Sequence, residues 1–113
     1  MSKGTEGMAK KRISEELLET IKMYLNKIGE YYRIDAAYLF GSYAKGTQHA
    51  DSDIDIAIVS KDISNRINDR IQMMNLTWKI SVDIEPHPYN TKNFRQDEYM
   101  LVGEILRTGI RVA

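Results

Sequence analysis

The chain has no cysteine among its 113 residues, which excludes disulfide bonds and zinc sites built from thiolates. No apolar run approaches the roughly 18 residues that a membrane-spanning helix needs, and no signal-peptide core stands near the N-terminus. Basic and acidic residues both number 16, so no excess of positive charge is available to attract a long nucleic acid. These absences predict a cytoplasmic protein with neither a membrane nor a long nucleic acid as partner.

Length and composition favour one globular domain. Apolar residues make up 42% of the chain and charged residues 28%, which are ordinary proportions for such a domain. A chain of 113 residues can build one core but not two. We expect residues 1–12, which are polar and end in a basic cluster, to form a mobile tail, and residues 13–113 to form a single domain.

Three segments carry apolar residues at helical spacing. The first begins after Ser14, a favourable N-cap, the second covers about 62–79, and the third covers about 97–107 with Gly109 as its C-terminal cap. We expect Trp78 to anchor the core. The expected apolar faces are Leu17, Leu18, Ile21, Tyr24, Leu25, Ile28 and Tyr31/Tyr32; Ile63, Ile67, Ile71, Met74 and Trp78; and Tyr99, Met100, Val102, Ile105 and Leu106.

Short apolar runs between these helices predict the strands. They cover 36–40, 54–60 and 80–85, and the end of the chain, 110–113, is expected to add a short edge strand. Proline cannot donate to a strand ladder, so we expect Pro86 and Pro88 to end the third strand. Strands alternating with helices predict an α+β sandwich, a mixed sheet with helices packed on one face.

The most informative segment runs from Gly41 to Asp55. A Gly-Ser pair is followed, after ten residues, by Asp-Ile-Asp at the head of an apolar strand. Alternate residues of a strand share a face, so Asp53 and Asp55 should point the same way. Two like charges at the head of a buried strand repel each other and are costly to desolvate, and a hard divalent cation would offset that cost.

A third carboxylate follows in the next predicted strand. Asp83 and Glu85 lie on its polar face, and Asp83 could join Asp53 and Asp55 on the same side of the sheet. Three carboxylates suit two Mg²⁺ ions about 3.5–4 Å apart. Asp83 is our preferred general base, although Glu85 on the same face keeps that assignment open.

The Gly-Ser pair supplies the other half of the expected site. Gly41 has no side chain, so a phosphate can approach the backbone closely, and Ser42 adds a hydroxyl. Backbone N–H groups in such a turn can form an anion-binding nest. With metal ions at the Asp pair, the turn would clamp a nucleoside triphosphate for attack on phosphorus with pyrophosphate leaving.

The spacing of Gly-Ser and Asp-x-Asp resembles the signature of the polymerase-β-type nucleotidyltransferase superfamily. The small size of the chain, over about 14–113, is similar to the minimal nucleotidyltransferases, the MNT family. One departure is Lys45, where the family often has arginine; lysine keeps the charge but loses bidentate phosphate geometry. The site residues that the resemblance implies are Gly41 and Ser42 for the triphosphate of ATP, and Asp53, Asp55 and Asp83 for magnesium and catalysis.

The resemblance also implies a partner. MNT proteins typically act as antitoxins of HEPN-domain, RNase-like toxins and transfer AMP from ATP to a tyrosine of the toxin. The short chain agrees, because we expect it to leave no residues for a separate acceptor-binding domain.

Two other functions remain open. One is an antitoxin that neutralises its partner by binding alone, and a less favoured one is a nucleotidyltransferase for small molecules. The tyrosine-rich first helix is compatible with a homo-oligomer or with a toxin interface. Both histidines, His49 and His87, are expected to be structural or exposed.

Overall fold

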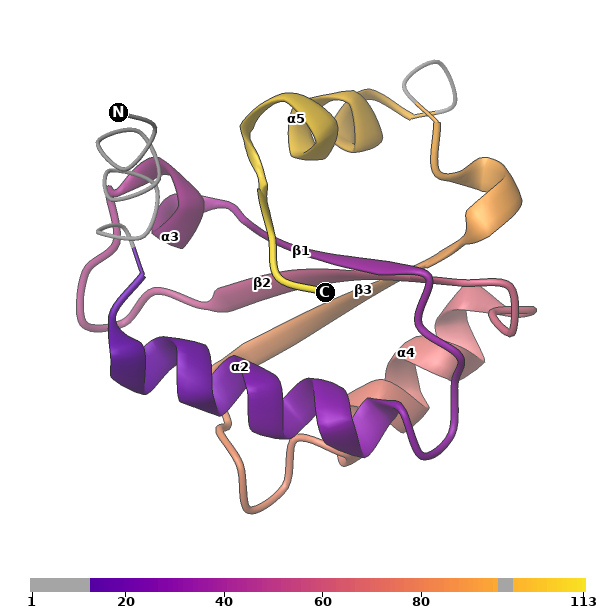
Figure 1. The fold of residues 1–113 in the computed structure, drawn as a ribbon, viewed down its shortest axis with the longest axis horizontal. Coiled ribbons are helices and arrows are strands. Elements are labelled where there is room, and N and C mark those ends of the chain that lie inside the picture. The colour runs from indigo at the N-terminus through magenta and orange to yellow at the C-terminus, as the bar shows by residue number, and fades with distance from the viewer. Residues whose placement is uncertain (1–12, 96–98) are drawn as a thin grey trace, which may run out of the picture.

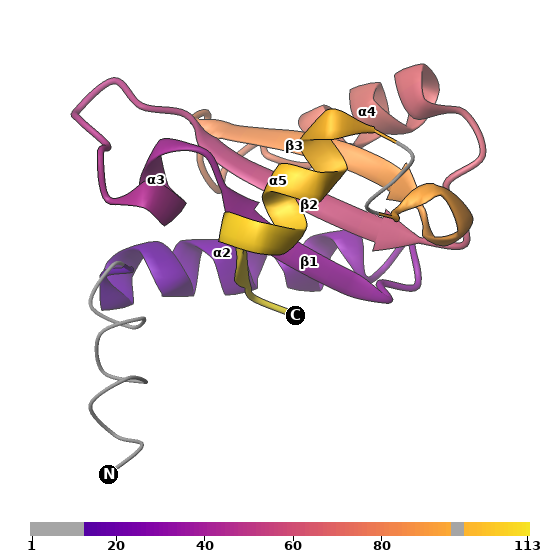
Figure 2. The same ribbon diagram turned by 90° about the horizontal axis from the view of Figure 1, so that it is seen from above.

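The computed structural model describes residues 13–95 and 99–113, so the predicted tail at 1–12 lies outside the described residues. A four-stranded sheet in the order β3-β2-β1-β4 lies between helices (Figures 1 and 2). The strands are β1 (Ala36–Phe40), β2 (Ile54–Ser60), β3 (Ile84–Asn90) and β4 (Ile110–Arg111). The helices are α2 (Glu15–Ile28), α3 (Ser42–Lys45), α4 (Arg66–Asn75) and α5 (Met100–Thr108), and a 3-10 helix, η1, covers Thr91–Asn93.

The predicted mixed sheet is confirmed. Strand β1 is antiparallel to β2 and β4, whereas β2 and β3 run parallel. The bounds predicted for the first two strands are those observed, and the end of the chain adds β4 at the sheet edge. The pairing of β1 with β2 sets Phe40 opposite Asp55, which brings the Gly41 turn beside the acidic pair.

Helices α2 and α4 cover one face of the sheet (Figure 1). Ser14 caps α2 as predicted, because its Oγ accepts a hydrogen bond of 3.0 Å from Leu17 N–H. The buried Tyr24 hydroxyl donates a bond of 2.8 Å to the carbonyl of Met73, which ties α2 to α4. The core on this face contains Ile21, Tyr24, Leu25, Ile28, Tyr32, Ala37, Leu39, Ile54, Ile56, Ile58, Ile63, Met73 and Ile84.

Helix α5 packs on the opposite face, so the sheet carries helices on both sides and not on one face as predicted (Figure 2). On this face a second, smaller buried core consists of Val102 and Ile105 of α5 together with Phe40, Ala57 and Tyr89. The predicted Gly109 cap and the short strand after it are both present. Three expected core residues of this helix, Tyr99, Met100 and Leu106, are exposed instead.

The predicted rotation of the second helix is wrong. Helix α4 is shorter than expected and buries Met73, whereas the side chain of Trp78, the expected anchor, is 72% exposed. Ile67, Ile71 and Met74 are exposed as well. The observed rotation buries Met73 and lets Nε of Arg66 and Nε of Arg70 donate to the carbonyls of Pro88 (2.9 Å) and Pro86 (3.2 Å).

The predicted bounds of the third strand are also wrong. Strand β3 begins at Ile84 and includes Pro86 and Pro88, which were expected to end it. It is an edge strand, and the carbonyls of both prolines point outward to the arginines of α4. In a strand the nitrogen of a residue points the same way as its carbonyl, so no ladder bond to β2 is lost.

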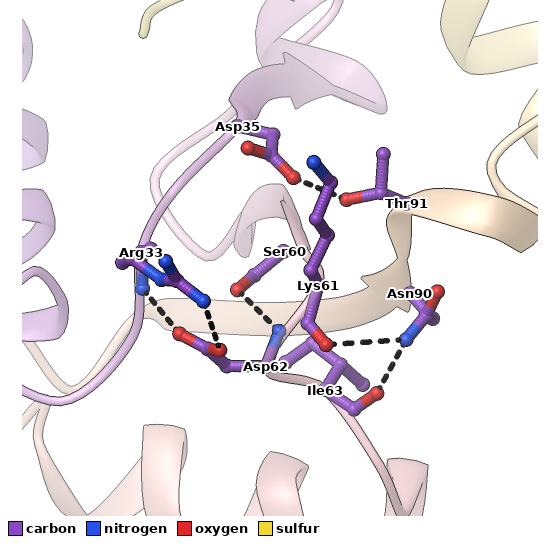
Figure 3. A network of polar contacts seen from close by, with 8 residues as sticks. All are labelled: Arg33, Asp35, Ser60, Lys61, Asp62, Ile63, Asn90 and Thr91. Atoms are coloured by element: carbon purple, nitrogen blue, oxygen red, sulfur yellow. Dashed lines mark hydrogen bonds and ion pairs between the residues drawn. The ribbon is translucent and has the colours of Figure 1, made fainter.

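A polar network ties together the other end of the sheet (Figure 3). Arg33 N–H donates to Oδ2 of Asp62 (2.9 Å), and Asn90 Nδ2 donates to the carbonyl of Ile63 (2.7 Å). The Thr91 hydroxyl donates to the Asp35 carboxylate. These contacts join the start of β1 to the ends of β2 and β3, far from Asp53 and Asp55. Among the described residues, no helix has the length and apolar character to cross a membrane.

Candidate active site

Gly41 makes the sharp turn between β1 and α3. Its φ of 76° and ψ of −150° lie in a region that is in practice open to glycine alone. A Cβ atom at Gly41 would lie 2.5 Å from Oδ2 of Asp55, which is closer than a Cβ atom approaches an oxygen to which it is not bonded. The backbone conformation therefore calls for glycine, and any larger residue would also have to displace the Asp55 carboxylate.

Asp53 and Asp55 stand at the head of β2, as predicted. Asp53 is exposed, and Asp55, the second residue of the strand, has a side chain that is 26% exposed. Within the described part of the chain, neither the Asp53 carboxylate nor the Ser42 hydroxyl has a hydrogen-bonding partner. The acidic pair and the Gly41 turn thus leave polar groups available beside one another.

The structure separates the two candidates for the third carboxylate. Asp83 lies in an exposed turn before β3 rather than within the strand, and its carbonyl accepts a bond of 2.8 Å from Ile54 N–H. Ile54 and Ile84 are paired across β2 and β3, and Asp53 and Asp83 are the residues directly before them. Glu85 is instead paired with Arg70 at 3.5 Å. Asp83 thus borders the acidic pair through its backbone.

The expected cluster of three carboxylates is not assembled. No group of three or more histidine or acidic side chains in the described residues could hold a metal ion. Magnesium in nucleotide enzymes is commonly held by one or two carboxylates together with substrate phosphates. The exposed Asp53, the partly exposed Asp55 and the open backbone at Gly41 fit magnesium that arrives with a nucleotide.

His87 is a site residue that sequence reasoning missed. Its Nε2 lies 3.1 Å from Oδ1 of Asp55, and its side chain is 24% exposed. The ring also packs edge-on against Phe40, with centroids 4.9 Å apart. A predicted strand that ends at Glu85 leaves His87 outside the sheet and so misses this contact. The two-residue alternation could have indicated it, because His87 lies two residues after Glu85 and therefore on the same face of the strand.

Lys45, the departure from the family pattern, is engaged with α5. Its Nζ lies 2.9 Å from Oε1 of Glu104. The hydrogen bond and the positive charge of Lys45 lower the pKa of Glu104 below its ordinary value. The lysine therefore links the turn that follows Gly41 to the helix above it.

Comparison with known proteins shows the family to which the chain belongs. The family model described as polymerase beta, nucleotidyltransferase matches residues 19–113. The protein adenylyltransferase MntA of Shewanella oneidensis is 51% identical over 35 residues, which are 31% of this chain and only 25% of that relative.

Two solved structures share the fold. A toxin–antitoxin structure with AMP-PNP aligns with a TM-score of 0.63 and 27% identity over 85% of this chain and 72% of that one. A mutant of the toxin–antitoxin MntA-HpeT aligns with a TM-score of 0.60 and 24% identity over the same shares, 85% and 72%. These similarities confirm the resemblance to the minimal nucleotidyltransferases that the motif indicates. The chain belongs to the polymerase beta nucleotidyltransferase family.

Proposed function

We propose that the protein is a magnesium-dependent nucleotidyltransferase that moves AMP from ATP to a tyrosine hydroxyl of a partner toxin and thereby acts as an antitoxin. The observation that carries this proposal is Asp55 set against the Gly41 turn, where a Cβ would lie 2.5 Å from the Asp55 carboxylate, with the exposed Asp53 two residues before it. The backbone conformation accounts for the glycine, but a structural role would not require two acids at the start of a buried strand.

The residues of the site divide the work of phosphoryl transfer. Gly41 leaves its backbone open to the phosphates, and the Ser42 hydroxyl donates to them. Asp53 and Asp55 offer carboxylate oxygens for magnesium, which when bound neutralises phosphate charge. The acceptor oxygen forms a bond to the α-phosphorus while the bond to the pyrophosphate oxygen breaks. Asp83, exposed beside the pair, accepts the proton of the attacking hydroxyl.

The partner and the nucleotide are inferred from the relatives. One related toxin–antitoxin structure holds AMP-PNP, which supports ATP as the donor. The MntA relative is a protein adenylyltransferase, which supports a protein acceptor. A HEPN toxin, a tyrosine acceptor and a cytoplasmic location follow from the family resemblance, and they belong to the same proposal.

The proposal is tested by incubating the chain with a co-encoded HEPN protein, Mg²⁺ and ATP labelled at the α-phosphate. Label should appear on a tyrosine of the HEPN protein, and it should be lost with EDTA or in Asp53→Asn. Asp62→Asn is the matched control, because Asp62 lies in the network at the far end of the sheet (Figure 3) and should leave labelling unchanged.

Two outcomes would contradict the proposal. No label with the wild-type chain, or equal label with Asp53→Asn, would rule out transfer at this site. If Asp53→Asn also neutralised the toxin fully, the chain would act as an antitoxin by binding alone.

A further inference from the structure

The two acids of the motif are held very differently. Oδ1 of Asp55 lies 3.1 Å from Nε2 of His87, and Oδ2 faces the backbone of Gly41. Asp53, two residues earlier, is exposed and has no side-chain partner among the described residues. One carboxylate is therefore fixed before any ligand arrives, while the other is free to adjust.

The side chain of His87 is itself held in place. His87 is paired with Ala57 across β2 and β3, and the small, buried alanine leaves room for the imidazole on this face of the sheet. Phe40, on the other side of β2, meets the ring edge-on at 4.9 Å. Phe40 is also the cross-strand partner of Asp55, so the strand pairing that places Asp55 also places the ring that packs against His87.

We propose that His87 is a positioning residue: its Nε2–H holds the Asp55 carboxylate against the Gly41 turn in the orientation that receives a metal–nucleotide. The inference rests on the proposed function, because it assigns Asp55 to the metal. A hydrogen bond to a metal-binding carboxylate fixes its rotamer, and loss of such outer partners typically lowers metal affinity or activity about 10–100-fold.

Three variants separate positioning from general stability. His87→Leu removes the donor, whereas His87→Gln retains an N–H near the position of Nε2. Tyr32→Phe is the matched control, because it also removes a side-chain hydrogen bond to an aspartate, the 2.9 Å contact with Asp69, on the opposite face of the sheet. All three are compared with the wild-type chain, and thermal melting confirms that each is folded.

The first readout needs no turnover. Binding of Mn²⁺ is followed by electron paramagnetic resonance in the presence of α,β-methylene-ATP. This analogue cannot transfer AMP, because a methylene group replaces the oxygen between its α- and β-phosphorus atoms. We expect His87→Leu to weaken Mn²⁺ binding at least about tenfold, His87→Gln to recover most of the loss, and Tyr32→Phe to match the wild type. In labelled transfer, His87→Leu should lower kcat and raise the Mg²⁺ concentration needed for half-maximal rate.

The outcomes distinguish this inference from the proposed function. If folded His87→Leu binds Mn²⁺ within about twofold of wild type, or if His87→Gln recovers nothing, His87 has no positioning role. If His87→Leu does not fold, His87→Gln decides alone: near-normal binding supports positioning, and binding as weak as in Asp55→Asn overturns it. If the wild-type chain itself binds no Mn²⁺ with the analogue, both the inference and the proposed metal site fail.

Discussion

At the scale of single residues, one glycine and two acids make up most of the candidate site. Gly41 is needed for its backbone conformation and for the space it leaves, and Asp55 fills that space with a carboxylate. Gly46, at the other end of α3, has a similar φ of 75° but no atom within 4 Å of the position of a Cβ. Substitution of Gly46 therefore tests the effect of backbone strain alone, whereas substitution of Gly41 adds the steric contact with Asp55.

We predict that Gly41→Ala and Gly46→Ala differ sharply in activity. Gly46→Ala should lower the free energy of unfolding by about 1–2 kcal/mol, the cost of a left-handed conformation, and should leave transfer activity nearly unchanged. Gly41→Ala should cost about 1–3 kcal/mol and also displace Asp55, reducing transfer about 100-fold. Urea unfolding and labelled transfer measure the two effects, and equal activities in the two variants would contradict the role given to Gly41.

At the scale of elements, tertiary contacts override local pattern in α4 and β3. The stripe of Ile67, Ile71, Met74 and Trp78 has helical spacing, yet it faces outward. Arg66 and Arg70 instead turn toward the prolines of β3, and the two elements stabilise each other. The outward carbonyls of an edge strand need a donor, and the guanidinium groups supply it.

We predict that Met73→Ala is far more damaging than Trp78→Ala. Met73 is fully buried, so its truncation leaves a cavity and should cost about 2–5 kcal/mol of unfolding free energy. Trp78 is 72% exposed and contacts Lys79 by a cation–π interaction, so its loss should cost less than about 1 kcal/mol. Chemical denaturation of both variants checks the rotation of α4, and the reverse order would show that Trp78 is in the core.

The ion pair of Lys45 in α3 with Glu104 in α5 predicts how the stability of the fold depends on pH. The pKa of Glu104 is lowered, chiefly by the hydrogen bond from Lys45, so the contact stabilises the fold above the ordinary carboxyl pKa of 4.5. That contribution is lost as pH falls through the lowered pKa of the folded state. In Lys45→Met the pKa of Glu104 should rise toward 4.5, as measured by NMR titration of the carboxyl group.

A control variant separates this contact from a general change of charge. Lys61→Met removes a lysine at the far end of the sheet (Figure 3) and should leave the pKa of Glu104 where it is. If both variants shifted that pKa equally, the pairing of Lys45 with Glu104 would not be its cause.

At the scale of the whole molecule, the sheet separates two cores. The larger core lies under α2 and α4, and the smaller one, under α5, includes Phe40 and Ala57 beside the site. His87 and Asp55 therefore stand at the border of a packed cluster rather than on a free loop. We therefore expect ligand binding at this candidate site to carry only a small ordering cost.

We predict that a metal–nucleotide stabilises the entire fold. Mg²⁺ with α,β-methylene-ATP at 100 times its Kd should add about 2.7 kcal/mol to the free energy of unfolding, because it binds only the folded chain. Thermal melting should show a clear upward shift that EDTA abolishes and that Asp53→Asn lacks. An equal shift without Mg²⁺ would contradict a role for the acidic pair in metal binding.

Much of the fold and site follows from sequence, since local signals there agree with the tertiary structure. Strands β1 and β2 are short apolar runs with clear ends, and Ser14 is an N-cap that needs only its own helix. The proximity of Gly41 to Asp55 follows from the antiparallel pairing of those two strands. These features depend on residues close in the chain or on the two-residue alternation of strands.

The sequence by itself determined the motif, the mixed sheet and the family, because spacing and alternation are local properties. Only the tertiary structure decided the rest. Pro86 and Pro88 can lie inside β3 because it is an edge strand, and whether a strand is at an edge depends on the order of the whole sheet. The same order brings His87 to Asp55 and leaves the carbonyls of Pro86 and Pro88 at the edge, where the arginines of α4 bond to them.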